Sequence, residues 1–337
     1  MEVLAFGVQT DEKPLMEAAF AGRHDLRCLD VFLTGDTAPL AAGYEAVSTS
    51  VNADLDARVL HALAAGGTRM IAQRSTGFNN IDLTAAQQLG LTVARVSSYS
   101  PYSVAEFAWA LAMAVNRRLV RAAIRTRDFD FRLDGLLGHD LHGRTAGVVG
   151  TGRIGEAFTR IAHGYGMELL GWDVAPNPAC VALGMRYVEK EELFAASDVL
   201  SLHVPLVPET RHLVDAAALK AMKDDAILVN SSRGGLIDTD ALVTELRAGR
   251  FTGVGLDVYE AEAGLFYLDK SLEPVTDDTL ARLMTFPNVV VTSHQAYYTV
   301  DAVTEIIATT VRNITDYEAD RRSENVLVPP PGDLTAG

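Results

Sequence analysis

TAGVVGTGRIG, residues 145–155, is the segment from which the fold of this chain is most directly inferred. Its first five residues are small or β-branched and predict a short strand. The glycines Gly150, Gly152 and Gly155 then follow with the spacing G-x-G-x-x-G, which allows a tight turn, a close approach of the backbone to a pyrophosphate and close packing of the next helix. We expect that helix to begin near Arg153, so that its free N–H groups and the positive end of its dipole face the phosphates of a dinucleotide.

An acidic residue ends the next predicted strand. Residues 168–172 (ELLGW) have the composition of a strand, and Asp173 follows them. A carboxylate at this point accepts hydrogen bonds from both ribose hydroxyls of NAD and repels the additional phosphate of NADP. No Arg or Lys occurs in residues 174–177 to bind that phosphate. The pattern therefore predicts an NAD site, the alternative being an ordinary strand–turn–helix unit that binds no nucleotide.

Length and composition exclude several classes of protein. A chain of 337 residues, 48% of them hydrophobic, is long enough for two domains with substantial cores. The net charge of −15 argues against a nucleic acid or an anionic membrane as partner, and an anionic substrate would then need nearby arginines. Cys28 and Cys180 stand far apart without a CxxC partner, which favours a reducing compartment and argues against disulfides or a zinc site. The start, MEVLAFGVQT, has no basic segment and predicts a strand rather than a signal peptide, so we expect a cytoplasmic protein.

Strand-like and helix-like segments alternate along the chain in two series. In the first, strands are predicted at residues 3–8, 46–51, 69–74 and 92–96, with helices at 14–21, 56–65 and 84–89. In the second, further strands are predicted at residues 168–172, 199–206, 226–232, 253–259 and 288–294. Such alternation predicts α/β architecture with doubly wound parallel sheets covered by helices.

Two long helices are also expected. The first opens at Ser100-Pro101 and crosses between the domains; Ser103 and Glu106 have the spacing of a capping box and mark an alternative start. The second runs from Tyr297 to about Glu318, beyond the last predicted strand, and is expected to return to the first domain.

Reactive residues follow the predicted strands at the ends where ligands bind in open α/β sheets. Arg233 follows AILVNSS, Asp257 follows GVGL and His294 ends NVVVTSH, while Glu262 lies five residues beyond Asp257. A guanidinium binds a carboxylate bidentately, and a histidine donates the proton that a new alkoxide requires, with a carboxylate holding its ring in one tautomer. This set suits hydride transfer to a 2-oxo acid, although each residue alone is also explained as a surface charge, a turn former, a loop residue or a structural histidine.

Several motifs together resemble those of the D-2-hydroxyacid dehydrogenases, above all the NAD-dependent fermentative D-lactate dehydrogenase branch. The segments that carry the resemblance are RSTGFNNIDL (74–83), YSPYSVAEFAWAL (99–111), GRTAGVVGTGRIG (143–155), SLHVPLVPET (201–210), VNSSRGGLID (230–238), GLDVYEAE (255–262) and NVVVTSHQAYYT (288–299). The resemblance implies an oxidoreductase with a flavodoxin-like substrate domain, residues 1–100 plus 299–337, and a Rossmann NAD-binding domain, residues 101–298, with a cleft between the two domains.

The resemblance also implies roles for single residues. Arg233 would bind the substrate carboxylate, His294 would donate the proton, and Glu262 would pair with His294. The substrate contacts would come from Arg233, Tyr99, Tyr297 and the backbone of Thr76 and Gly77. The cofactor contacts would come from Gly150, Gly152, Arg153, Ile154, Gly155, Asp173, Val204, Pro205, Thr210, Ser231, Ser232 and Asp257, the last beside the nicotinamide.

The substrate implied is pyruvate, reduced reversibly to D-lactate with NADH. Residues 263–270 follow Glu262 where many members of the wider family have proline, and this aromatic-bearing segment resembles the D-lactate branch. Phe266, Tyr297 and Tyr298 would crowd the space beyond substrate C3 and favour a methyl group. The alternative is that these three residues pack the domain hinge. The alternatives are a larger 2-oxo acid, such as phenylpyruvate or 2-oxoisocaproate, and a non-catalytic NAD-sensing protein, against which the intact catalytic set argues.

Beyond a small 2-oxo or 2-hydroxy acid, the expected partner is a second copy of the chain, since family precedent implies a homodimer or homotetramer. No nucleic acid or membrane partner is expected. Five arginines cluster on and after the helix that opens at Pro101: Arg117, Arg118, Arg121, Arg125 and Arg127. We expect them to form a solvated or subunit-interface face, with an anionic effector site as the alternative. His139 and His142 lie in a glycine-containing loop and are not expected to bind a metal.

Overall fold

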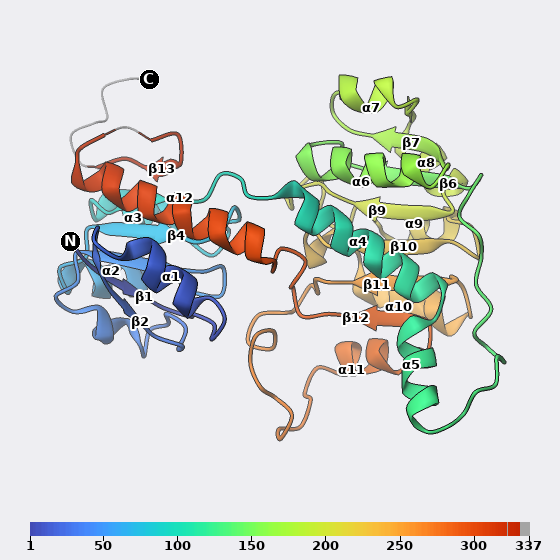
Figure 1. Cartoon of the computed structure of the whole chain (residues 1–337), viewed down its shortest axis with the longest axis horizontal. Coiled ribbons are helices and arrows are strands. Elements are labelled where there is room, and N and C mark those ends of the chain that lie inside the picture. Colours follow the sequence, from blue (N-terminus) through green and yellow to red (C-terminus); the bar gives the residue numbers. More distant parts are fainter. Residues whose placement is uncertain (322, 331–337) are drawn as a thin grey trace. The chain divides into compact units, whose positions relative to one another are not determined.

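The computed structural model describes residues 1–321 and 323–330, and the chain divides into two compact units. Unit 1 contains Met1–Ser100 and the segment that begins at Thr299, and unit 2 contains Pro101–Tyr298. Each unit is a sheet covered by helices (Figure 1). Residues 322 and 331–337, which the predicted substrate domain included, lie outside the described residues.

Unit 1 contains a sheet in the strand order β13-β5-β4-β3-β1-β2. The strands are β1 (Glu2–Ala5), β2 (Asp25–Cys28), β3 (Ala46–Thr49), β4 (Met70–Gln73), β5 (Thr92–Ala94) and β13 (Val326–Val328). The helices are α1 (Lys13–Phe20), the 3-10 turn η1 (Ala38–Ala41), α2 (Ala57–Ala65), α3 (Leu83–Gln88) and α12 (Val300–Glu318). Helix α12 packs on α1 and β4 and buries Val303, Ile307 and Val311, so the tail helix completes the core of unit 1, as predicted.

Unit 2 contains a sheet in the strand order β12-β11-β10-β9-β6-β7-β8, with parallel pairing between all neighbours. The strands are β6 (Thr145–Val149), β7 (Glu168–Trp172), β8 (Arg186–Tyr187), β9 (Val199–Leu202), β10 (Ile227–Asn230), β11 (Gly253–Leu256) and β12 (Val289–Val291). The helices are α4 (Pro101–Asn116), α5 (Leu119–Arg127), α6 (Arg153–Gly164), α7 (Pro178–Ala182), α8 (Lys190–Ala196), α9 (Ala216–Ala221), the 3-10 turn η2 (Gly234–Leu236), α10 (Thr239–Arg247) and α11 (Asp278–Thr285). The strand order reverses between β6 and β9, which is where an open α/β sheet forms a crevice for a ligand.

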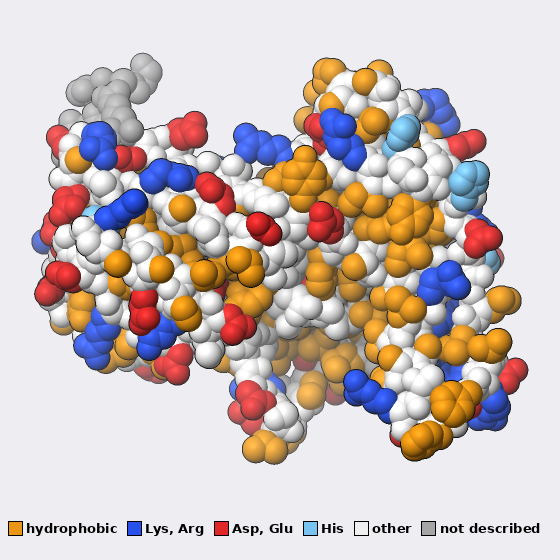
Figure 2. Space-filling model, in the orientation of Figure 1, with side chains coloured by type: hydrophobic (Ala, Val, Ile, Leu, Met, Phe, Trp, Pro, Cys, Tyr) orange, Lys and Arg blue, Asp and Glu red, His pale blue; other side chains and the backbone are white. Residues whose placement is uncertain are grey.

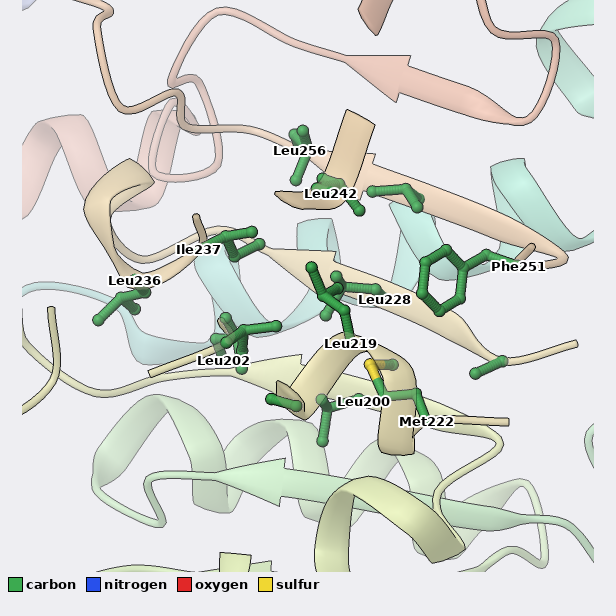
Figure 3. Close-up of a cluster of buried hydrophobic side chains, with 14 of the residues drawn as sticks. Leu200, Leu202, Leu219, Met222, Leu228, Leu236, Ile237, Leu242, Phe251 and Leu256 are labelled. Carbon is green, nitrogen blue, oxygen red and sulfur yellow. The ribbon is translucent and has the colours of Figure 1, made fainter. Parts of the chain in front are cut away.

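Both faces of the unit 2 sheet are buried. Leu200, Leu202 and Leu228 belong to the hydrophobic cluster on one face, much of which is shown in Figure 3. Val199 and Val229, their neighbours in sequence, belong to the cluster on the opposite face. Successive side chains of a strand point to opposite faces, so a sheet with two covered faces needs strands that are apolar throughout. This requirement explains the continuous apolar runs that the sequence shows.

Helix α4 lies within unit 2, so the prediction that it crosses between the domains is wrong. It begins at Pro101 rather than at the alternative start near Ser103. Glycines in β11 let the helix approach closely, because a Cβ at Gly253 would lie 2.5 Å from Val115 and one at Gly255 would lie 2.9 Å from Leu111. This close packing against β11 fixes α4 to the sheet of unit 2.

Other expectations about the elements need correction. The strands are shorter than predicted; the segment predicted to end at residue 206, for example, leaves the sheet after Leu202. Strands β2, β8 and β13 were not predicted, and β13 pairs antiparallel with β5, so the first sheet is not wholly parallel. β2 is an edge strand whose residues alternate between exposed and half-buried, which gives no continuous apolar signal. Among the described residues, no helix has the length and hydropathy of a membrane span.

Candidate active site

The glycine turn lies at the carboxyl end of β6, at the point where the strand order reverses. A Cβ on Gly150 (φ +87°) would lie 2.7 Å from Cγ1 of Val204, and one on Gly155 would lie 1.9 Å from the carbonyl oxygen of Gly150. Both glycines are therefore required by the packing of the protein itself. A Cβ on Gly152 would meet no protein atom within 4 Å. Gly152 instead leaves open space at the start of α6.

Helix α6 begins at this open space without a side-chain cap. Its N-cap is Gly152, which has no side chain to accept a hydrogen bond from the first turn. Arg153 is exposed there and Ile154 is half-buried. Uncapped N–H groups at a helix N-terminus bind phosphate, helped by the helix dipole. The open space and the uncapped helix fit the pyrophosphate of a dinucleotide.

Asp173 supports the glycine turn at the end of β7. Its Oδ2 accepts hydrogen bonds from the backbone N of Thr151 (2.6 Å) and from the Thr151 hydroxyl (3.1 Å), and its Oδ1 accepts one from the backbone N of Val174 (2.7 Å). The Tyr187 hydroxyl donates to the Thr151 hydroxyl at 2.8 Å. A carboxylate oxygen has two lone pairs, so these contacts orient the group and leave acceptor capacity for a ribose.

The loops after β9 and β10 contain the remaining predicted cofactor contacts. The Ser232 hydroxyl donates to the carbonyl of Val204 at 2.6 Å and joins the two loops. The Thr210 hydroxyl donates to the carbonyl of Pro205 at 2.6 Å and closes the loop from within. The Ser231 hydroxyl is buried without a hydrogen-bond partner in the described part of the chain. An unpaired buried hydroxyl beside the glycine turn is consistent with a ligand in this crevice.

His203 lies in the same region as a neutral side chain. Burial lowers its pKa to about 3. Its Nε2 lies 2.9 Å from the Ser201 hydroxyl, its ring packs on Phe158, and its Nδ1 is buried with no partner among the described residues. A histidine in this state does not carry a proton between reactants.

Asn230 and Gly234 position Arg233 after β10. The Asn230 side chain accepts a hydrogen bond from the backbone N of Ser232 (3.0 Å) and donates one to the carbonyl of Arg233 (2.8 Å). A Cβ on Gly234 would lie 2.1 Å from the backbone of Tyr259, so the Arg233 turn packs directly on the segment that leads to Glu262. Nη1 of Arg233 donates to the Ser232 carbonyl, and no carboxylate pairs with this guanidinium within the described ranges. Arg233 is thus oriented and still able to bind an anion.

His294 and Glu262 form a hydrogen-bonded pair. Nδ1 of His294 lies 2.8 Å from Oε1 of Glu262, and both side chains are partly buried, 16% and 28% exposed. The other carboxylate oxygen, Oε2, accepts a hydrogen bond from the backbone N of Tyr259 at 3.0 Å. Glu260 instead pairs with Arg211 and His212, away from His294. The structure thus brings together the histidine and the glutamate that the sequence analysis selected, and the pairing leaves Nε2 of His294 available.

Asp257 organises the backbone around His294. It is fully buried, and its carboxylate accepts hydrogen bonds from the Thr292 hydroxyl (2.6 Å) and the backbone N–H groups of Gln295 (2.9 Å) and Ala296 (2.8 Å). The backbone N of His294 donates to the Asp257 carbonyl at 2.7 Å. Its predicted place beside the nicotinamide stays a prediction.

In unit 1, the loop after β4 contains Thr76 and Gly77. Nη1 of Arg95 donates to the Thr76 carbonyl at 2.8 Å, and the Ser75 hydroxyl donates to the Gly77 carbonyl at 2.7 Å. Nε2 of Gln73 also donates to Ser75 at 3.0 Å. The carbonyl groups of this loop are therefore held by hydrogen bonds within the protein. This leaves the backbone N–H groups of the loop as the groups that could bind an anion. Tyr99 is half-buried at the end of unit 1.

Four residues that hold these loops were not predicted: Asn230 and Tyr267 in unit 2, the latter donating from its hydroxyl to the His294 carbonyl, and Gln73 and Arg95 in unit 1. Asn230 is the polar last residue of an apolar strand, directly before Ser231-Ser232-Arg233, and this position was the one available signal. The others act through hydrogen bonds to backbone or side-chain groups of irregular loops, which residue spacing does not reveal. Within the described residues no group of His, Cys, Asp and Glu could hold a metal, so the histidines of the 139–142 loop have no metal-binding geometry there.

An NAD-type dinucleotide site and an adjoining Arg–Glu–His set define an oxidoreductase, and comparison with known proteins identifies its family. Residues 109–296 match the family model of the D-isomer specific 2-hydroxyacid dehydrogenase, NAD binding domain. The D-lactate dehydrogenase of Escherichia coli is 45% identical over 320 residues, which cover 95% of this chain and 97% of that protein. The chain belongs to the D-2-hydroxyacid dehydrogenase family and is an NAD-dependent oxidoreductase.

Solved structures agree with this assignment. A structure described as the pyruvate reductase of Chlamydomonas reinhardtii superposes with a TM-score of 0.92 at 40% identity, covering 96% of this chain and 98% of that one. The Aquifex aeolicus D-lactate dehydrogenase complexed with NAD and lactic acid gives a TM-score of 0.84 at 31% identity, covering 97% and 99%. The protein is therefore a D-lactate dehydrogenase-like 2-hydroxyacid dehydrogenase.

Proposed function

We propose that this enzyme reduces pyruvate to D-lactate with NADH, and oxidises D-lactate in the reverse direction. The observation that carries the proposal is the 2.8 Å pair of His294 and Glu262, together with an Arg233 that has no carboxylate partner in the described chain. Relatives named D-lactate dehydrogenase and pyruvate reductase support pyruvate as the substrate.

The three side chains divide the work of the reaction. Arg233 binds the substrate carboxylate through its planar guanidinium and polarises the adjacent ketone. His294, as imidazolium, donates a proton from Nε2 to the oxygen of that ketone, while Glu262 keeps the ring in the required orientation and stabilises its charge. Bound NADH supplies the hydride. In the oxidation direction, neutral His294 accepts the proton from the hydroxyl of lactate.

The cofactor preference rests on Asp173. Its carboxylate lies at the end of β7 with its orientation fixed by Thr151 and Val174, and an anion in that place repels a 2′-phosphate. We therefore propose NAD rather than NADP, with the contacts inferred from the sequence: the uncapped start of α6 for the pyrophosphate, and Val204, Pro205, Thr210, Ser231 and Ser232 along the adjoining loops.

Substrate size is set by aromatic residues after Glu262 and His294. The rings of Tyr297 and Tyr298 lie edge to face, 5.8 Å apart, and Phe266 is half-buried against the core. In this proposal they limit the space beyond substrate C3, which favours the methyl group of pyruvate over the larger side chains of phenylpyruvate and 2-oxoisocaproate.

A panel assay tests the proposal. We expect purified enzyme to consume NADH with pyruvate faster than with phenylpyruvate or 2-oxoisocaproate. We expect His294→Ala to lower kcat by about 10²–10⁴-fold while the Kd for NADH stays nearly unchanged. The exposed His163, on α6, offers a control, and His163→Ala should retain activity.

The direction of the pH dependence provides a second readout. Reduction consumes a proton and oxidation releases one, so kcat/KM for pyruvate should fall with rising pH while that for D-lactate rises. Parallel pH profiles in the two directions would contradict the role given to His294. Absence of turnover with every 2-oxo acid, with NADH binding intact, would favour an NAD-sensing protein instead.

We also propose a cytoplasmic, homo-oligomeric enzyme, either a dimer or a tetramer. Both cysteines, Cys28 and Cys180, are free thiols, which suits a reducing compartment. The case for self-association rests on an exposed apolar surface of unit 2 on α5 and the segment after it.

A further inference from the structure

The segment that carries Glu262 folds into a compact turn. The backbone N–H groups of Leu265 and Phe266 both donate to the Glu262 carbonyl at 3.0 Å, and the side chains of both residues pack on the core of unit 2. Tyr267 follows with a left-handed backbone (φ +65°). The turn is thus anchored to the core. Its last residue, Tyr267, has an uncommon backbone conformation.

Tyr267 returns to the same histidine that Glu262 contacts. Its hydroxyl donates a hydrogen bond to the backbone carbonyl of His294, and its ring lies tilted at 39° to the imidazole with the centroids 6.2 Å apart. Glu262, five residues earlier, holds Nδ1 of the imidazole at 2.8 Å. One turn of the chain therefore holds both the side chain and the main chain of His294.

The main chain of His294 needs such support. Its φ of +56° lies in the left-handed region, which is uncommon for non-glycine residues and is kept where the surrounding structure holds it. Asp257 holds the N–H side of this bend through His294, Gln295 and Ala296. Tyr267 holds the carbonyl side. Loss of either contact lets the backbone relax and moves the imidazole away from the line of proton transfer.

We propose that Tyr267 is a positioning residue for proton transfer: through its hydrogen bond to the His294 carbonyl it fixes the backbone bend from which the imidazole projects. The proposal rests on the assignment of His294 as the proton donor. In this proposal Tyr267 acts through His294 rather than on the substrate, and its hydroxyl is the group that makes the contact.

The phenol remains a hydrogen-bond donor under working conditions. Burial raises the pKa of Tyr267 far above its usual value, and the nearby Tyr297, Asp257 and Glu262 raise it further. A deprotonated phenolate would repel the carbonyl oxygen, so a strongly raised pKa keeps the contact intact across the pH range of the reaction.

The test replaces only the hydroxyl. We expect Tyr267→Phe to lower kcat for pyruvate reduction by about three- to tenfold, the range that one hydrogen bond supports, with the Kd for NADH unchanged. Tyr317→Phe is the control, because Tyr317 is also a partly buried tyrosine but lies on α12 and packs against the core of unit 1. It should leave kcat near the wild-type value. An unchanged kcat in Tyr267→Phe would overturn the proposal.

Two further measurements separate positioning from general stabilisation. In a His294→Ala background, Tyr267→Phe should have no effect on residual turnover, since no imidazole remains to be positioned; an undiminished effect there would refute the proposal. In ¹⁵N-histidine NMR of the cofactor-free protein, Tyr267→Phe should shift or broaden the His294 signal, identified by its loss in His294→Ala. An unchanged signal would also refute it. If His294→Ala itself retains full activity, the proposed role of His294 fails, an outcome distinct from these.

Discussion

Glu262 and His294 are 32 residues apart in the sequence, yet their side chains meet at 2.8 Å. Each lies in a loop at the carboxyl edge of the unit 2 sheet, and parallel strands direct those loops to one edge. This regularity is why the sequence sufficed to select Arg233, Glu262 and His294 as candidates. It did not reveal Tyr267, because that contact depends on a left-handed residue inside an irregular turn.

His203 allows the effect of burial on the pKa of a single side chain, and so on stability, to be tested. Its pKa is lowered from 6.5 to about 3 by burial, so the folded protein keeps it neutral where the unfolded chain binds a proton. The unfolded state therefore takes up more protons as the pH falls below about 6.5, and the stability contributed by this neutral histidine is lost between about pH 6.5 and pH 3.

Replacing His203 by an uncharged residue should remove this pH dependence. Between pH 6.5 and pH 5, we expect the free energy of unfolding of the wild type to fall by about 2 kcal/mol more than that of His203→Gln. Urea denaturation at the two pH values measures the difference. His163→Gln, at an exposed position, should behave like the wild type; a His203→Gln curve with the same pH dependence as the wild type would show that the native imidazole is accessible to protons.

Among the elements, the strand–glycine turn–helix unit was predicted most closely. The expected strand matches β6, and α6 begins at Arg153 as expected. Strong local signals explain this, because β-branched residues favour a strand and spaced glycines favour a turn through residues that are close in the sequence. Strand β13 was missed because three residues that pair at a sheet edge are specified by the tertiary structure rather than by their own pattern.

Alanine substitutions at three glycines of α6 and its turn distinguish effects on folding from effects on cofactor binding. Gly155→Ala places a Cβ 1.9 Å from a backbone carbonyl and should destabilise the fold by about 1–3 kcal/mol. Gly152→Ala places its methyl group in open space, so the stability should change by less than about 1 kcal/mol, while the Kd for NADH rises about tenfold.

Gly164→Ala is the control within the same helix. It lies at the far end of α6 with no atom within 4 Å of the added Cβ, so it should stabilise the helix by about 0.5–1 kcal/mol without affecting NADH binding. Thermal denaturation and fluorescence titration with NADH measure the two effects. Equal NADH affinity in Gly152→Ala and the wild type would contradict the assignment of this space to the pyrophosphate.

For the whole molecule, the open question is self-association. Unit 2 exposes apolar residues on α5 and the segment after it, here called the α5 surface: Leu119, Val120, Ile124, Phe129, Phe131, Leu133 and Leu137. Figure 2 shows hydrophobic side chains gathered over this region. Arg125 orders the segment by bonding the Asp130 carboxylate and the carbonyls of Arg132 and Asp134. Arg125 therefore stabilises this segment from within, while the role of the other four arginines of the cluster stays a prediction.

An ordered surface of this kind is uncommon on monomers. Phe131 is 71% exposed and Leu133 is 81% exposed, and a groove of about 350 Å³ beside α5 is lined by Val120, Ile124, Met284 and Phe286. Contiguous exposed apolar side chains mark association sites, and in a homo-oligomer the same patch serves both subunits. We therefore expect the α5 surface to be the interface between two copies of this chain.

Polar substitution on this surface should dissociate the oligomer. We expect wild-type protein to elute in light-scattering chromatography at a multiple of the monomer mass, and Phe131→Ser/Leu133→Ser to elute as a monomer. Both side chains lie on the surface, so their replacement removes no core contact. The unfolding temperature of the isolated subunit should therefore stay nearly unchanged. Leu272→Ser, at a position 98% exposed elsewhere in unit 2, should leave the oligomer intact. A wild-type protein that is monomeric at all concentrations, or a double variant that remains oligomeric, would exclude the α5 surface as the interface.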